Sequence, residues 1–395
     1  MTFLLDLAIV TISCLVLGLA SKHLRQTAIP VYIIAGILLG KSGFNLITSY
    51  DFVEWLGKIG VIFLLFYIGH EFHYKGLKEH GRLFAGCTDF VVNFVAGFSL
   101  GLLIGLTLIE AFILASAVYI SSSAIVITTL IENKRLIHPE AETVVWLMVF
   151  EDIILVILLV VLTSIMVGNS SAIPISLATA LLFIVLLLAI IGRLSNFISP
   201  LFERDDEIPI LLTFALIFGF SAIAHHLVVS VELVAFFLGS ALSGVGSFKR
   251  PFGAIITFKD LFLTIFFFSF GMMLPIKLSG LPSTNFVIAL LTLIALSILG
   301  KFVSGAIIGK RVHDSLEKGL IIGAYTTPRG EFSIVLLAVA IGTGVSVSEL
   351  LSSLVIAYVI ILSLIGSSIA RYGDRTGKAM AGVINKLITQ AHRYR

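Results

Sequence analysis

The sequence predicts an all-α polytopic membrane protein with 13 transmembrane helices. Hydrophobic residues make up 58% of the chain and charged residues 12%, and the mean hydropathy is +1.11, which excludes a soluble domain. Apolar runs recur along the chain, each of roughly 18–25 residues, enough to cross about 30 Å of hydrocarbon as a helix. The runs do not alternate with polar residues as barrel strands would.

The expected spans follow the apolar runs in order. They lie at approximately 3–20, 29–45, 52–70, 83–106, 108–131, 142–166, 172–196, 208–225, 228–245, 260–276, 285–309, 319–341 and 347–370. The run 3–20 lacks a basic n-region and a small-residue cleavage site, so we expect a retained helix rather than a signal peptide. A transmembrane domain of 1–370 and a short basic tail at 371–395 follow from this assignment.

Basic residues predict the orientation. Alternate connections, together with the tail, place twenty-one of the 26 Lys and Arg residues on one side, whereas the other side holds only Lys41, Lys58 and Lys277. Short cytoplasmic loops are rich in Lys and Arg. We therefore expect a multi-pass protein of the cell (inner) membrane with the N-terminus outside and the C-terminus in the cytoplasm. The last two basic residues, Lys301 and Arg329, fall inside expected spans.

Thirteen spans divide into six, one and six. Span 172–196 would link two halves, 1–166 and 208–370, of opposite topology, which is typical of an inverted repeat. The spans of the two halves are paired by their order and direction alone, because the halves have no clear sequence identity. Under it, span 108–131 corresponds to span 319–341.

Both of these paired spans carry polar residues at mid-length. The first contains Ser121, Ser122 and Ser123, and the second contains Thr326, Thr327, Pro328, Arg329, Gly330 and Glu331. Proline removes a backbone donor and glycine loosens the next turn, so we expect a broken helix there. Broken helices at corresponding positions of two repeats indicate an ion site at the membrane midplane. The alternative for the serines is back-bonding or helix packing.

The stretch "LMVFEDIILVI" places Glu151 and Asp152 inside span 142–166. A carboxylate at the bilayer centre costs about 2.5–3.5 kcal/mol, so each should face protein or water and have a partner. Lys301 is the obvious cation, and its pairing with one carboxylate leaves the other to hold a cation or a proton. If Lys301 also released its proton, binding of one cation at this site would displace two protons. A structural ion pair without a transport role is the alternative.

Other charged residues suggest structural roles. We expect Arg329 and Glu331 to neutralise each other, or a residue such as Glu71, and to hold the broken helix in place. Asp89 is one of several acids that lie near a span end or lack an evident partner in the sequence.

The chain resembles the second cation:proton antiporter family, which includes sodium/proton antiporters of the NapA type and potassium efflux proteins of the Kef type. The resemblance covers essentially the whole chain. It rests on "IPVYIIAGILLG", "LGKIGVIFLLFYIGHEF", the serines of span 108–131, "FEDIILVI", Lys301 and "TTPRGEFSIV".

The resemblance implies an NhaA/NapA-like fold in which spans 108–131 and 319–341 are unwound and cross beside the site. It implies that Asp152 binds the monovalent cation and the proton, and that Glu151 pairs with Lys301. It also implies a homodimer that works by elevator-type alternating access. The pair Glu-Asp differs from the family's Asp-Asp, Asn-Asp and Gln-Asp pairs, which leaves the ion and the stoichiometry open.

The expected function is secondary antiport of Na⁺, or as a close second K⁺, against H⁺, with no enzymatic activity, no cofactor and no nucleic-acid partner. The chain has no GxxxxGK[ST] motif, which argues against ATP-driven pumping. A Kef-type K⁺/H⁺ efflux protein with a separate cytosolic regulatory subunit is one alternative. A cation channel is another, because hydroxyl-lined broken helices also build selectivity filters.

Overall fold

A computed structural model describes residues 2–23, 28–71, 81–135, 137–166, 173–226, 231–245, 248–273, 283–342 and 347–393. The regular structure in these ranges is helical. The helices are α1 (Thr2–His23), α2 (Ile29–Leu39), α3 (Tyr50–Glu71), α4 (Arg82–Leu103), α5 (Leu108–Tyr119), α6 (Ser123–Glu132), α7 (Pro139–Met166), α8 (Ile173–Phe202), α9 (Ile208–His226), α10 (Val231–Ser243), α11 (Lys249–Met273), α12 (Thr284–Val312), α13 (Leu316–Tyr325), α14 (Glu331–Gly342), α15 (Glu349–Arg371) and α16 (Gly373–Arg393).

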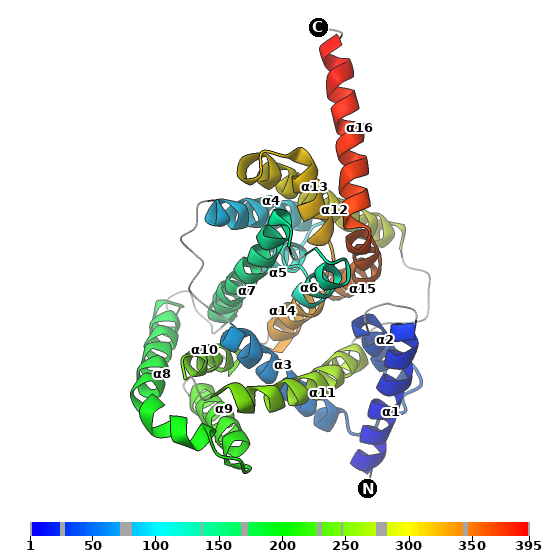
Figure 1. Ribbon diagram of the computed structural model, residues 1–395. Coiled ribbons are helices and arrows are strands. Elements are labelled where there is room, and N and C mark those ends of the chain that lie inside the picture. Colours follow the sequence, from blue (N-terminus) through cyan, green and yellow to red (C-terminus); the bar gives the residue numbers. More distant parts are fainter. Residues whose placement is uncertain are drawn as a thin grey trace.

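The helices form two groups (Figure 1). In one group α3 packs along α10 and α11, and α11 also packs on α2. In the other group α4 packs on α5 and α12, and α12 packs on α13. The second group also includes α7. It therefore contains Glu151 and Asp152 on α7 and Lys301 on α12.

Glycine allows α12 and α13 to touch backbone to backbone. A Cβ atom added at Gly323 would lie only 2.6 Å from the carbonyl oxygen of Lys301. Residues other than glycine would push the two helices apart, because real Cβ atoms do not approach an oxygen so closely. This contact fixes the position of Lys301 relative to the end of α13.

Two expected spans are interrupted in the structure. Span 108–131 consists of α5 and α6, with Ile120 extended (φ −76°, ψ 125°) between them. Span 319–341 consists of α13 and α14, separated by residues 326–330. The interruption at Pro328 agrees with the missing N–H of proline. At the other one, Ser122 caps α6 by accepting a hydrogen bond from the backbone of Ile125, a role that serine favours.

The basic tail forms a helix. This helix is α16, whose first half packs on α13. Gly377 and Ala381 are buried, and Asp374 lies 3.1 Å from the guanidinium of Arg135. The spacing of four residues places both buried positions on one helix face.

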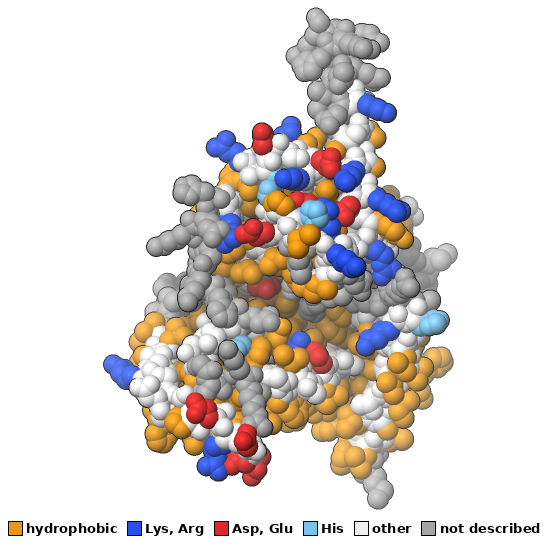
Figure 2. Space-filling view, viewed as in Figure 1, with side chains coloured by type: hydrophobic (Ala, Val, Ile, Leu, Met, Phe, Trp, Pro, Cys, Tyr) orange, Lys and Arg blue, Asp and Glu red, His pale blue; other side chains and the backbone are white. Residues whose placement is uncertain are grey.

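The surface agrees with a membrane environment. Hydrophobic side chains cover much of the lower part of the visible face, and charged side chains gather towards the end that carries α16 (Figure 2). Within the described ranges, seven helices are at least 18 residues long and apolar enough to cross a membrane. Shorter apolar helices, including α2 and α5, accompany them.

Candidate functional site: a buried lysine between two carboxylates

Lys301 lies at the centre of a fully buried charge cluster. Its ammonium nitrogen lies 2.7 Å from Oδ2 of Asp89 on α4 and 2.8 Å from Oε1 of Glu151 on α7. The ring centroid of Tyr119, at the end of α5, is 5.4 Å from the same nitrogen. The exposed fraction is 0% for Lys301 and 1% for each of the two acids. Four helices therefore converge on one positive charge.

Glu151 also connects to the interruption of the first broken helix. Its Oε1 accepts a hydrogen bond from the Ser121 hydroxyl at 2.9 Å, and its Oε2 accepts one from the backbone N–H of Ser121. The hydroxyl of Ser121 is also 2.8 Å from the carbonyl oxygen of Thr326. Ser121 thus joins Glu151 to both interruptions.

The two interruptions lie against each other. The backbone N–H of Ser122 donates to the carbonyl oxygen of Pro328 at 2.9 Å. A Cβ atom added at Gly330 would lie 2.5 Å from the Ser122 hydroxyl oxygen, so this position requires glycine for close approach. A backbone N–H released by one break is therefore satisfied by a carbonyl oxygen of the other, as irregular backbone inside a membrane requires.

Arg329 binds the carbonyl ends of the broken helices. Its guanidinium donates to the carbonyl oxygens of Val118 at 3.1 Å, Thr326 at 3.0 Å and Thr327 at 2.9 Å. It also donates to the hydroxyls of Tyr358 at 2.9 Å and Ser297 at 3.0 Å. The last carbonyls of a helix carry partial negative charge, so this cation stabilises the ends of α5 and α13. Glu331 and Glu71 were the expected partners of Arg329. The side chains of both lie outside the described part of the chain.

The remaining expected site residues lie around this cluster. Asp152 follows Glu151 on α7 and is half-buried, in contrast to its neighbour. Ser123, the first residue of α6, is half-buried as well. The hydroxyls of Thr326 and Thr327 bond back to the carbonyl oxygens of Ile322 and Gly323 within α13, at 3.0 and 2.8 Å. These two threonines therefore contribute their backbone carbonyls, rather than their hydroxyls, to the network.

Asp89 is the residue that sequence reasoning missed. Its Oδ1 accepts hydrogen bonds from Ser304 at 2.7 Å and from Asn93 at 3.0 Å, while its Oδ2 contacts Lys301. At about 1.5 Å per residue it lies roughly 10 Å into α4 and not at its end. Asn93, one helical turn after Asp89, could have indicated this role in the sequence. The two residues place polar groups on one face of an otherwise apolar helix.

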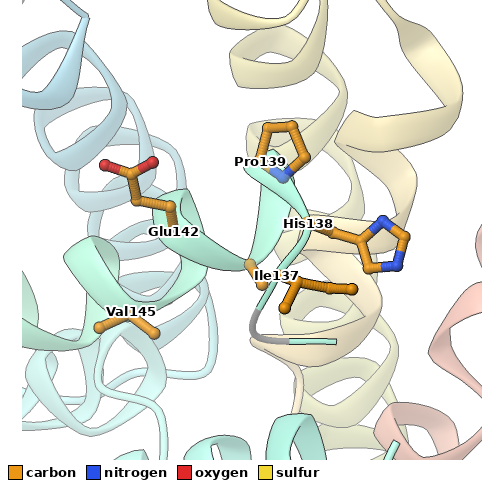
Figure 3. A pocket seen from close by; sticks show the side chains of 6 residues that line it. Ile137, His138, Pro139, Glu142 and Val145 are labelled. Carbon is orange, nitrogen blue, oxygen red and sulfur yellow. The ribbon is translucent and has the colours of Figure 1, made fainter. Parts of the chain in front are cut away.

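A surface hollow of about 500 Å³ lies elsewhere. It is lined by Ile137, His138, Pro139, Ala141, Glu142 and Val145, and the side chain of His138 points away from Glu142 (Figure 3). This hollow is at the turn that joins α6 to α7. None of the charged residues around Lys301 lines it.

Residues 9–373 match the family described as "Sodium/hydrogen exchanger, transmembrane". The chain belongs to the sodium/hydrogen exchanger family. The exchanger is thus one of the cation/proton antiporters, which are multi-pass membrane transporters rather than catalytic enzymes.

Two curated relatives are similar to the exchanger over most of its length. The K(+)/H(+) antiporter subunit KhtU of Bacillus subtilis is 31% identical over 90% of this chain and 89% of its own. The ammonium/H(+) antiporter subunit AmhT of Alkalihalophilus pseudofirmus is 27% identical over 82% of this chain and 83% of its own.

A solved structure supports the fold. The sodium proton antiporter MjNhaP1 of Methanocaldococcus jannaschii superimposes on the exchanger with a TM-score of 0.69, covering 97% of this chain and 100% of the other. The two sequences are 18% identical, so this likeness concerns the fold alone.

Proposed function

We propose that the exchanger moves a monovalent cation, Na⁺ or K⁺, in exchange for H⁺ across the cell membrane. The observation that carries the proposal is the buried Lys301–Glu151 pair beside the half-buried Asp152, at the meeting point of two interrupted helices. Buried intramembrane charges are costly, and their presence in a family of exchangers favours a transport role over a structural one.

In this proposal Asp152 binds the cation and the proton in turn. It is more exposed than Glu151, and the proposal therefore assigns ion binding to Asp152 rather than to Glu151. The carbonyl and hydroxyl oxygens of Ser121, Ser122, Ser123 and Thr326 lie near the interruptions and are suitable ligands for a hard monovalent cation, which prefers oxygen. Exchange requires that the two ions compete for one carboxylate.

The transport cycle in this proposal is elevator-type alternating access in a homodimer. α5–α6 and α13–α14 would cross at their interruptions as equivalent parts of a six, one and six inverted repeat. The hydrogen bond from Ser122 to Pro328 supports the crossing. The N-terminus would face outside and the basic tail the cytoplasm, as the positive-inside rule favours.

Potassium is the second candidate ion, and one observation favours it. The relative KhtU, at 31% identity, is named as a K(+)/H(+) antiporter subunit. A K⁺/H⁺ efflux antiporter that works with a separate cytosolic regulatory subunit is therefore the alternative to Na⁺/H⁺ exchange. The site supports a cation channel less well than an antiporter. A buried cluster of acids and a lysine favours competition between a cation and a proton for one site, rather than conduction.

Transport by the purified chain in proteoliposomes tests the function. Na⁺, K⁺ and Li⁺ are added separately outside vesicles that hold a trapped pH indicator. We expect at least one of these cations to drive proton efflux from an acidic lumen, while choline does not. Proton movement that is the same with choline would contradict antiport, and unitary current steps in a planar bilayer would favour a channel.

A further inference from the structure

The cluster around Lys301 contains two carboxylates rather than the one that a simple ion pair needs. Asp89 and Glu151 contact the same ammonium group from α4 and α7, at 2.7 and 2.8 Å. With both acids ionised, this set has one more negative than positive charge. Such a cluster is expected to hold the proton of Lys301 more firmly than a single ion pair would. Loss of that proton would leave two buried carboxylates facing each other.

Every carboxylate oxygen of the two acids receives a donor. Oδ1 of Asp89 accepts from Ser304 and Asn93, and Oδ2 accepts from Lys301. Oε2 of Glu151 accepts from the backbone N–H of Ser121, and Oε1 accepts from Lys301. A backbone N–H cannot turn into an acceptor, so a proton on Oε2 of Glu151 would break a bond that nothing replaces. The hydrogen bonds of this cluster therefore suit two carboxylates and one ammonium group.

We infer that Asp89 is a positioning residue that keeps Lys301 charged through the whole transport cycle. This inference rests on the proposed function. Because Lys301 keeps its proton and Glu151 stays ionised, Asp152 is the group that changes its protonation state among the charged side chains described at this site. One proton leaves the Asp152 carboxyl as one monovalent cation binds the carboxylate, so the charge of the loaded site is the same in both half-cycles. Exchange is therefore one proton per cation and electroneutral.

The test measures charge and protons in the same preparation. Proteoliposomes with the full-length chain are adsorbed on a solid-supported membrane, and the current after a jump of Na⁺ or K⁺ is recorded beside the signal of a trapped pH dye. For the unmodified chain we expect cation-driven proton flux without sustained current. A sustained current that scales with the proton flux would overturn the inference and leave antiport intact. Absence of any cation-driven proton flux would instead contradict the proposed function.

Variants of Asp89 test its part directly. In Asp89→Asn one carboxylate remains beside Lys301, so we expect the residual exchange to acquire a sustained current that scales with its proton flux. Asp89→Glu, which restores the carboxylate, should exchange without current. Asp51→Asn is the matched control, because it removes one negative charge from an exposed position at the start of α3 and should change neither signal.

Two results would contradict the role of Asp89. One is an Asp89→Asn protein that exchanges at the unmodified rate and without current, because Lys301 would then need only Glu151. The other is an Asp89→Glu protein that generates current. If Asp89→Asn fails to fold, the current of the unmodified chain and that of Asp89→Glu still decide the question.

Discussion

At the scale of residues, the site depends on differences between neighbours. Glu151 and Asp152 are adjacent in the sequence, yet Glu151 is buried and contacts Lys301, while Asp152 is half-buried. Successive residues on a helix point about 100° apart, so the two side chains lie in different surroundings. Two chemically similar groups therefore receive different tasks, one as a fixed counter-ion and one, in the proposed function, as the exchanging ligand.

Removal of Lys301 should destabilise the protein. In Lys301→Gln the two carboxylates lose their shared cation, and an uncompensated buried charge costs about 3–5 kcal/mol. Thermal unfolding in detergent measures the loss. Asp89→Asn should destabilise the unmodified chain but recover part of the stability in the Lys301→Gln background, because it removes one of the two unpaired charges. Equal effects of Asp89→Asn in both backgrounds would show that Asp89 and Lys301 are not coupled.

At the scale of elements, the two interrupted helices depend on close packing of Gly330 against Ser122. We expect Gly330→Ala to reduce stability by about 1–3 kcal/mol, the usual cost of overpacking, and to slow transport, because its Cβ would meet the Ser122 side chain. Ser122→Gly removes the clashing atoms and costs only a few tenths of a kcal/mol as a helix cap. The double variant should therefore be more stable than Gly330→Ala alone. Additive losses would contradict the contact.

Much of the helical framework was predictable, because long apolar runs have few alternatives to a membrane helix. The position of Pro328 and Gly330 also indicated an interruption, since both residues weaken a helix locally. The partner of Lys301 on α4 was not predictable in the same way. Asp89 and Lys301 are 212 residues apart in the sequence, and only the packing of α4 on α12 brings them together. The bonds of Arg329 to carbonyls were missed because released backbone acceptors cannot be read from side-chain types.

At the scale of the whole molecule, the basic residues predict which side each loop occupies. Asn285 and Glu317 are exposed and lie just beyond opposite ends of the long apolar part of α12. In a background with Cys14→Ala and Cys87→Ser, a cysteine at position 285 should react with an impermeant maleimide in intact cells. A cysteine at position 317 should react only after permeabilisation. The reverse pattern would contradict the orientation.

The central claim is that a single carboxylate, Asp152, binds the cation and the proton alternately. The most direct test is cation-driven proton flux in proteoliposomes with Asp152→Asn, with Glu151→Gln as the matched variant on the same helix. Asp152→Asn keeps the volume but removes the titrating group, so we expect its flux to fall by at least about tenfold in a protein that still inserts and unfolds cooperatively. Glu151→Gln should keep part of the flux, with an altered pH dependence, because the binding carboxylate remains. An active Asp152→Asn protein beside an inactive Glu151→Gln protein would contradict the account and reverse the two roles.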